Sequence, residues 1–127
     1  VGGDGWDSPE LTKIGGTAVE GTFFTNHYSK DDTRPIVKEF VGKFKAKYGA
    51  DPDALAALAY DATYIMLNAV KTAGTADGAA IKDALARTDL EVVSGRVKFD
   101  ANRNPVKSIV IIEIKGGEQV YRTTVLP

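Results

Sequence analysis

Residues 51–74 read D-P-D-A-L-A-A-L-A-Y-D-A-T-Y-I-M-L-N-A-V-K-T-A-G, and this stretch decides the fold because no other run could anchor a core. Asp51 or Asp53 can cap the first turn of a helix, and Gly74 offers a left-handed residue at its end. Apolar side chains fall on more than one side of this helix, which is typical of a buried element. We therefore predict one helix of roughly 20 residues, about 30 Å long, that is buried over most of its surface.

A membrane span is the alternative for so apolar a segment. Asp61 and Asn68 interrupt it, however, and its large aliphatic side chains are too sparse for a bilayer. The sequence therefore predicts no membrane insertion. It also makes Asp61 an acid that needs a hydrogen-bond partner if the helix is buried.

The composition is that of a single globular domain. The 127 residues have a hydrophobic content of 43%, which is enough to bury a core. The 16 basic and 17 acidic residues leave a net charge of -1, so the chain presents no field that would attract nucleic acid. There is no cysteine, which excludes disulfides and thiolate chemistry. The chain opens on Val1 and two glycines without a signal peptide, so we expect a fragment of a longer protein.

Helical and extended patterns follow one another around the long helix, as in an α/β protein. We expect a strand end running into a glycine-flanked turn over 1–6, helices over 9–14, 35–48 and about 75–87, and strands over 19–25, 93–100, 108–114 and 118–126. Gly116 and Gly117 predict a hairpin, and the apolar run 109–112 predicts a strand covered on both faces. Four aromatic residues are expected in the core, namely Phe23, Phe24, Tyr60 and Tyr64. One sheet would separate the first strands from the last hairpin by a long helical excursion, which is an awkward topology.

The stretch Gly2–Trp6, G-G-D-G-W, is the one place where an acid, a flexible backbone and a large aromatic meet at an expected strand end. Ligands of open α/β sheets collect at such ends. A turn in which Asp4 bonds its own backbone is the alternative, and the sequence leaves both open. The glycines match neither the dinucleotide nor the P-loop pattern, so a functional Asp4 would be a partner for a cation.

The other candidate sites favour structural roles. His27 is the only histidine, so a metal centre or a Ser-His-Asp triad would depend on one loop residue, and a surface or hinge histidine is the better interpretation. Residues 100–104, D-A-N-R-N, begin like a calcium loop, but Pro105 and Ile111 replace its glycine and its glutamate. We expect a turn there and no metal site.

Five tracts keep a common order and spacing, namely Gly3–Trp6, Val19–Thr22, Ala57–Ala62, Gly95–Asp100 and Asn104–Lys107. Together they resemble the C-terminal half of the branched-chain amino-acid-binding proteins, the periplasmic solute receptors of ABC importers. The resemblance covers nearly the whole chain. It implies an α/β fold of the type I periplasmic-binding-protein class, in which two Rossmann-like lobes joined by three hinge strands close on a small amino acid.

On this resemblance the chain would hold pieces of both lobes. Residues 1–26 would form a strand-helix-strand piece of the second lobe, residues 27–107 helices and strands of the first lobe, and residues 108–127 a hairpin that returns to the second lobe. This layout removes the awkward topology. It also implies three partners: a small amino acid, an ABC transporter permease, and either the N-terminal half of the same protein or a second copy of this chain.

The resemblance implies ligand contacts as well. Asp4 matches the acid that holds the α-ammonium group of the ligand, Gly5 and Trp6 lie in the adjoining loop, and Leu55 falls near a position that contacts the ligand side chain. The better-known leucine and isoleucine receptors carry Glu where this chain has Asp4, so the identity of the ligand stays open. The resemblance implies no cofactor, no metal and no catalysis, and it places the complete protein in the periplasm.

Two other functions remain. A flavodoxin-like α/β enzyme or phospho-acceptor domain could use Asp4 as its reactive carboxylate, although no second acid adjoins it. Alternatively, the chain is an assembly piece whose copies pair by exchanging elements, because isolated pieces of two lobes would expose strand edges and apolar surface.

Overall fold

The computed structural model describes residues 1–127. The elements in chain order are η1 (Asp4–Trp6), α1 (Pro9–Gly15), η2 (Gly16–Val19), β1 (Phe23–Asn26), α2 (Pro35–Tyr48), α3 (Ala54–Ala73), α4 (Gly78–Ala86), β2 (Asp89–Val92), β3 (Gly95–Phe99), β4 (Pro105–Val106), β5 (Ile109–Lys115) and β6 (Glu118–Val125). The strands form two separate three-stranded sheets, in the orders β1-β5-β6 and β2-β3-β4. The chain is therefore a mixed α/β protein, as predicted.

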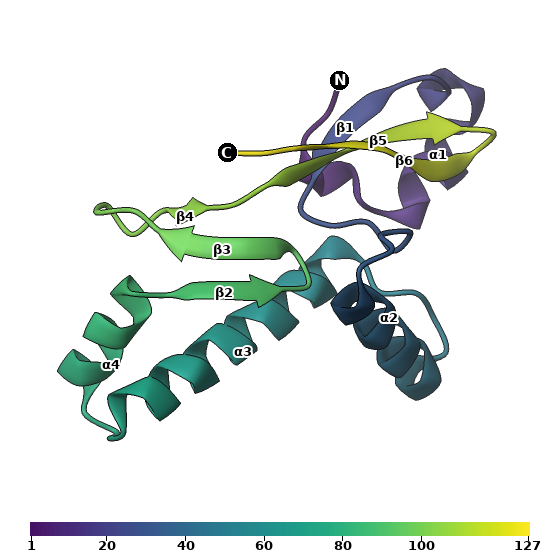
Figure 1. Ribbon diagram of the computed structural model, residues 1–127. Coiled ribbons are helices and arrows are strands. Elements are labelled where there is room, and N and C mark those ends of the chain that lie inside the picture. Colours follow the sequence, from purple (N-terminus) through teal and green to yellow (C-terminus); the bar gives the residue numbers. More distant parts are fainter.

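The two sheets belong to two parts of the molecule (Figure 1). α1 lies beside the first sheet, whereas α2, α3 and α4 accompany the second. The chain leaves the first part through residues 27–34, which we call the outgoing segment, and comes back through residues 107–108, the return segment. These two segments are the points where the chain passes between its two parts.

Three α-helices, α1, α3 and α4, begin at capping side chains, whereas α2 follows Arg34 without a side-chain cap. Asp53 caps α3 by accepting a hydrogen bond from the N–H of Ala56, and α3 ends at Gly74 in the left-handed conformation. Asp77 caps α4 and Ser8 caps α1 in the same way. Such caps satisfy N–H groups that the first turn of a helix leaves unpaired. The structure confirms that α1, α2, α3 and α4 form where the sequence predicted helices.

The first sheet is antiparallel throughout, with β5 in its centre. Gly116 and Gly117 form the turn between β5 and β6 with φ values of 63° and 76°, which confirms the predicted hairpin. The carboxylate of Glu20 accepts hydrogen bonds from the N–H groups of both glycines, at 2.6 and 3.2 Å. The core of this part consists of Phe24, Val110, Ile112 and Ile114, with Trp6, Leu11 and Val19 packed against it.

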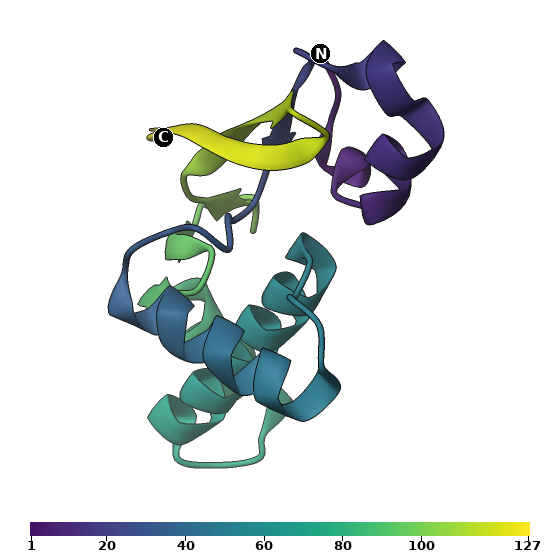
Figure 2. The ribbon, with the colours of Figure 1, turned by 90° about the vertical axis from the view of Figure 1, so that its right-hand side faces the viewer.

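The second part has its core between the outgoing segment, α2, α3 and the second sheet. In the view of Figure 2, α2 lies across α3. The residues of the main cluster are Tyr28, Val37, Phe40, Ala54, Ala57 and Val93. Further along α3, Ile65 packs against Val92 and Val97 of the second sheet.

Residues 1–6 hold the expected strand end only as an isolated parallel bridge from Gly2 to Phe24, and Asp4–Trp6 form the expected turn, which is a 3-10 turn. One expectation near the N-terminus was wrong. The strand expected over 19–25 begins only at Phe23. Gly21 has a φ of 73°, a left-handed conformation that cannot continue a β-ladder.

The long helix is buried on one face only, which corrects the prediction that most of its surface is covered. Its buried residues recur at helical spacing and are Ala54, Ala57, Asp61, Ile65 and Ala69. Its exposed apolar residues are Leu55, Tyr64, Met66, Leu67 and Val70.

β5 and two aromatic residues are also less buried than predicted. Along β5 the side chains of Val110, Ile112 and Ile114 are buried, and those between them are half-buried, so one face is fully covered. Phe23 and Tyr64 were expected in the core but are 39% and 55% exposed. The chain thus carries more apolar surface than it covers by itself.

Candidate functional site

Asp4 opens the η1 turn, two residues after the bridge between Gly2 and β1. Its side chain is 62% exposed, and Oδ2 lies 3.0 Å from Nε2 of His27. The hydrogen bond from His27, reinforced by the charge of that ring, lowers the pKa of Asp4 below its ordinary value. The carboxylate is therefore ionised at neutral pH, and its partner lies outside its own loop.

His27 is the first residue of the outgoing segment. The side-chain oxygen of Asn26 accepts a hydrogen bond from the His27 N–H at 2.8 Å, which fixes the backbone where β1 ends. On the far side of the ring, Nδ1 lies 3.5 Å from Nζ of Lys107, which also donates to the carbonyl oxygen of Ser108 at 3.1 Å. Burial lowers the pKa of Lys107. Asp4, His27 and Lys107 thus form a row of polar contacts where the chain passes between its two parts.

Trp6 supports the turn that carries Asp4. Its ring packs against Phe24 with a centroid distance of 6.4 Å. The ring also covers Gly2 so closely that a Cβ atom there would come within 2.2 Å of it, which explains the glycine. Gly5 has open space around it. Trp6 is therefore a partly buried packing residue of the first part, with Asp4 and Gly5 at the surface beside it.

Asp7 joins this turn to the start of α3. Its Oδ2 accepts a hydrogen bond from the N–H of Ala54 at 2.6 Å. This contact, between residues 47 positions apart, was not predicted from the sequence. It brings the first turn of α3, with Leu55, close to the η1 turn. Leu55 itself is 76% exposed.

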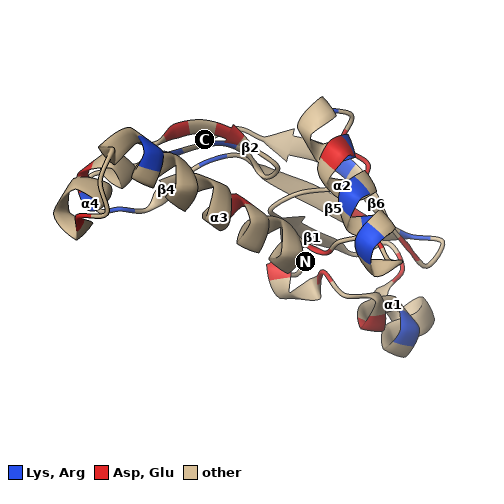
Figure 3. Cartoon of the chain, turned by 90° about the horizontal axis from the view of Figure 1, so that it is seen from below, with Lys and Arg blue, Asp and Glu red and all other residues tan.

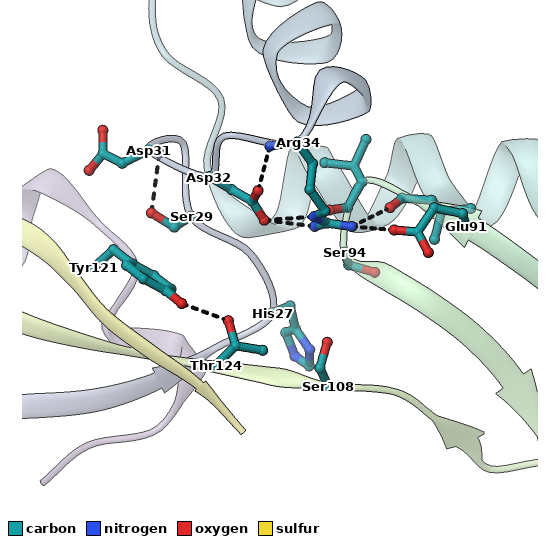
Figure 4. Close-up of polar contacts among 12 residues, drawn as sticks. His27, Ser29, Asp31, Asp32, Arg34, Glu91, Ser94, Ser108, Tyr121 and Thr124 are labelled. Carbon is teal, nitrogen blue, oxygen red and sulfur yellow. Dashed lines mark hydrogen bonds and ion pairs between the residues drawn. The ribbon is translucent and has the colours of Figure 1, made fainter. Parts of the chain in front are cut away.

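Side chains of the outgoing segment bind residues of the second part (Figure 4). Arg34 pairs with Asp32 at 2.8 Å and with Glu91 at 2.5 Å, and it donates to the carbonyl oxygen of Val93 at 2.8 Å. The hydroxyl of the buried Tyr28 donates to the carbonyl oxygen of Pro52. Burial raises the pKa of this tyrosine, so it remains a donor.

Asp61 has the partners that the sequence required of a buried acid. Its two carboxylate oxygens accept hydrogen bonds from the N–H groups of Val93 and Ser94, at 2.9 and 2.8 Å. These residues form the turn between β2 and β3. Asp61 is therefore a structural residue, as predicted.

A cavity of about 860 Å³ lies between the two parts and opens to solvent. His27, Ser108 and Tyr121 are among its lining residues, and Figure 4 shows them around the same space, whereas Asp4 is not part of the lining. Asp4 thus lies outside the lining of this cavity and contacts it only through His27.

Several other kinds of site find no support in the side-chain arrangement. No group of three or more His, Asp or Glu residues could hold a metal ion. Asp100 accepts hydrogen bonds from the N–H groups of Asn102 and Asn104, so residues 100–104 form the predicted turn. No helix combines the length and the hydropathy needed to cross a membrane. Figure 3 shows residues of both charge signs on α1, α2 and α4.

Comparison with known proteins gives a consistent picture. Residues 1–119 match the family described as periplasmic binding protein. The chain is 35% identical over 121 residues to Leu/Ile/Val-binding protein homolog 2 of Brucella abortus, covering 93% of this chain and 32% of that protein.

Solved structures agree. A leucine binding protein from Thermotoga maritima superposes with a TM-score of 0.88 at 41% identity, covering 98% of this chain and 36% of that one. A branched-chain amino acid transporter substrate binding protein from Streptococcus pneumoniae, solved with isoleucine, gives a TM-score of 0.83 at 32% identity over the same shares.

The chain spans about a third of the length of these proteins, and its two small sheets correspond to pieces of their fold. The proteins it matches are named for binding a solute, not for a reaction. The family match covers residues 1–119, and the first structure aligns with 98% of the chain. The chain therefore belongs to the periplasmic binding protein family and carries part of the two-lobed fold of its branched-chain amino-acid receptors.

Proposed function

We propose that this chain is part of a receptor that binds a branched-chain or other small amino acid between two lobes and delivers it to an ABC importer. The names of its relatives support this class of ligand. The observation that carries the proposal is the carboxylate of Asp4, which is exposed, ionised and held from outside its own loop. Such a group suits an ammonium ion.

The chain contributes to both lobes in this proposal. Residues 1–26 and 108–127 belong to the second lobe, and residues 27–107 belong to the first. The strand pairing supports the division, since β1 pairs with β5 and β5 with β6, whereas β2, β3 and β4 pair among themselves. The outgoing and return segments are then two of the hinge connections.

Asp4 holds the α-ammonium group of the ligand in the closed receptor. The ring of His27 is hydrogen-bonded to Oδ2 of Asp4, and the remaining lone pairs of the carboxylate can accept hydrogen bonds from the ammonium. Gly5 leaves room beside Asp4, Trp6 keeps the turn in place, and Leu55 adds apolar contact from the other lobe. Closure follows because only the closed state lets both lobes contact the ligand.

The remaining partners follow from the same proposal. The complete receptor works in the periplasm and docks on an ABC transporter permease. The rest of the receptor, or a second copy of this chain, covers the exposed apolar face of α3. No observation at Asp4 favours the phospho-acceptor alternative, because the side chain that meets this carboxylate is a histidine and not a second acid.

Titration calorimetry on the complete receptor tests the proposal. We expect leucine, isoleucine or valine to bind in a one-to-one complex. In Asp4→Ala the affinity should fall by roughly 100-fold or more, because an ammonium buried without its partner costs about 3 to 5 kcal/mol. The matched control is Asp83→Ala, an exposed acid on α4 that pairs with Lys82. Equal affinity in Asp4→Ala and Asp83→Ala would remove Asp4 from the site.

A further inference from the structure

The hydrogen bond from Ala54 to Asp7 is a direct polar link between the two parts of the molecule. Oδ2 of Asp7 accepts it at 2.6 Å. Apart from the outgoing and return segments, no other hydrogen bond or ion pair joins residues 1–26 or 108–127 to residues 35–106. We infer that Asp7 is a positioning residue that holds the receptor closed over its ligand, so that loss of this contact speeds ligand release. The inference rests on the proposed function.

Both partners of this hydrogen bond lie beside the proposed ligand contacts. The N–H of Asp7 donates to the carbonyl oxygen of Asp4 at 3.0 Å, so one turn carries both the ligand acid and the acceptor. On the other side, Leu55 directly follows Ala54. A ligand between Asp4 and Leu55 therefore spans the same two turns that the hydrogen bond joins. The ligand and the hydrogen bond then favour the same arrangement of the two lobes.

The donor suits a hydrogen bond that forms on closure and breaks on opening. Ala54 is the first residue of α3, so its N–H has no acceptor within the helix. Ala54 is 3% exposed in this arrangement, and a buried N–H without an acceptor is costly. When the two parts separate, water can replace Asp7 at this N–H. The closed state therefore needs Asp7, whereas the open state leaves no group unpaired.

The surroundings of the contact are polar, which suits a reversible separation. A small cavity of about 40 Å³ lies beside it and is lined by both parts. Asp7 and Gln119 belong to the first part, and Pro52 belongs to the second. The main hydrophobic clusters of the two parts share no residue. Separation at this contact therefore divides no hydrophobic core, so one hydrogen bond can shift the balance between open and closed states.

The rate of ligand release should report this role. In Asp7→Ala the closed state keeps a buried N–H without an acceptor, while the open state loses nothing. We expect the dissociation constant for leucine to rise roughly tenfold, the effect of one hydrogen bond lost from the closed state. The dissociation rate should carry this change, and the association rate should stay within about twofold of the wild type. Asp7→Asn retains an acceptor oxygen and should restore most of the affinity.

Stopped-flow fluorescence with leucine and the complete receptor measures both rate constants. The matched control is Asp53→Ala, because Asp53 accepts from the N–H of Ala56 at the same helix end but within the second part. Loss of that cap weakens the helix start in the open and closed states alike, so the control should bind and release leucine like the wild type. If Asp7→Ala and Asp53→Ala show the same rate constants, Asp7 only supports the helix and the inference is wrong.

Amide hydrogen exchange, followed by NMR in the wild-type receptor, is a second readout that needs no variant. Leucine should slow the exchange of the Ala54 N–H by roughly tenfold or more, because its acceptor arrives on closure. The N–H of Ala56, which is held within the second part, should change much less and is the internal control. Equal effects of leucine at both positions would overturn the inference, even if Asp7→Ala folds poorly.

Asp4→Asn separates this inference from the proposed function. If Asp4→Asn binds leucine as tightly as the wild type while Asp7→Ala releases it faster, the proposed ligand acid is wrong and the role of Asp7 stands. If Asp4→Asn loses affinity while Asp7→Ala matches the wild type in affinity and in both rate constants, the ligand site stands and the role of Asp7 is wrong.

Discussion

Asp61 is a buried acid whose partners lie far along the chain. It is 3% exposed, and its carboxylate holds the N–H groups of Val93 and Ser94, which are also buried. The sequence required a partner for an acid inside an apolar helix but offered no way to identify it. The identity of the partner depends on how the β2–β3 turn folds back on α3.

Removing this carboxylate should destabilise the chain strongly. In Asp61→Ala two buried N–H groups lose their acceptor, and each unpaired group costs about 1 to 3 kcal/mol, so we expect a loss of about 2 to 6 kcal/mol in the free energy of unfolding. Urea unfolding of the 127-residue chain measures it. Asp83→Ala, an exposed change on the neighbouring helix, should stay within about 0.5 kcal/mol. Similar losses in both variants would contradict the structural role of Asp61.

The candidate site was predictable from sequence only in part. Asp4 could be singled out because it stands among glycines beside an aromatic residue. His27 carried one usable signal, since it is the only histidine and lies at the expected crossing point, but nothing in the sequence placed its ring against Asp4 or Lys107. Those contacts join residues 23 and 80 positions apart in the chain, beyond the reach of local pattern.

At the scale of elements, the N-terminus of α3 joins the two parts of the molecule. Asp53, the residue directly before α3, caps it, and Asp7 accepts from the N–H of Ala54 across 47 positions of sequence. The hydroxyl of Tyr28 reaches Pro52, directly before the cap. Three contacts of different origin thus meet at one helix end, close to the proposed ligand contact of Leu55.

Loss of the Asp7 contact should loosen this helix end. In Asp7→Ala the Ala54 N–H loses its acceptor, and we expect the free energy of unfolding to fall by about 1 to 2 kcal/mol. Amide hydrogen exchange should accelerate in the first turn of α3 and not at its C-terminal end. Glu10→Ala removes a neighbouring acid that is largely exposed and serves as the control. Unchanged exchange at Ala54 in Asp7→Ala would mean that this contact does not hold the helix.

The elements themselves were largely predictable, because helix caps and the Gly116-Gly117 turn are local signals. The failures have a common physical cause. Periodicity shows that both sides of α3 are apolar, but it cannot show which side finds a partner within the chain. β-propensity alone extended the predicted first strand back to Val19, but the left-handed Gly21 keeps it from starting before Phe23.

At the scale of the whole molecule, a groove of about 500 Å³ lies between α2 and α3 and is mostly apolar. The residues that form its aromatic and aliphatic wall are Phe40, Phe44, Tyr48, Tyr60, Tyr64 and Leu67. Together with the exposed second face of α3, it leaves the chain with apolar surface that water disfavours. The proposed receptor would cover this surface with its remaining two-thirds.

The isolated chain should therefore associate with itself. Light scattering at rising concentration should show dimers or larger species, because copies can bury this surface against each other. Leu67→Lys should shift the equilibrium towards the monomer. Ile14→Lys, which changes a hydrophobic residue that is 80% exposed on α1 and lies outside this groove, should shift it much less. A wild-type chain that stays monomeric and folded at high concentration would contradict the prediction.

The central claim is that Asp4 holds the ammonium group of an amino acid. The most direct measurement compares leucine with isocaproate, which is leucine without its α-ammonium group, in the wild-type and Asp4→Asn receptors by calorimetry. We predict that the wild type prefers leucine by roughly 100-fold or more and that Asp4→Asn loses most of this preference. An Asp4→Asn receptor that still prefers leucine by the same factor would contradict the account.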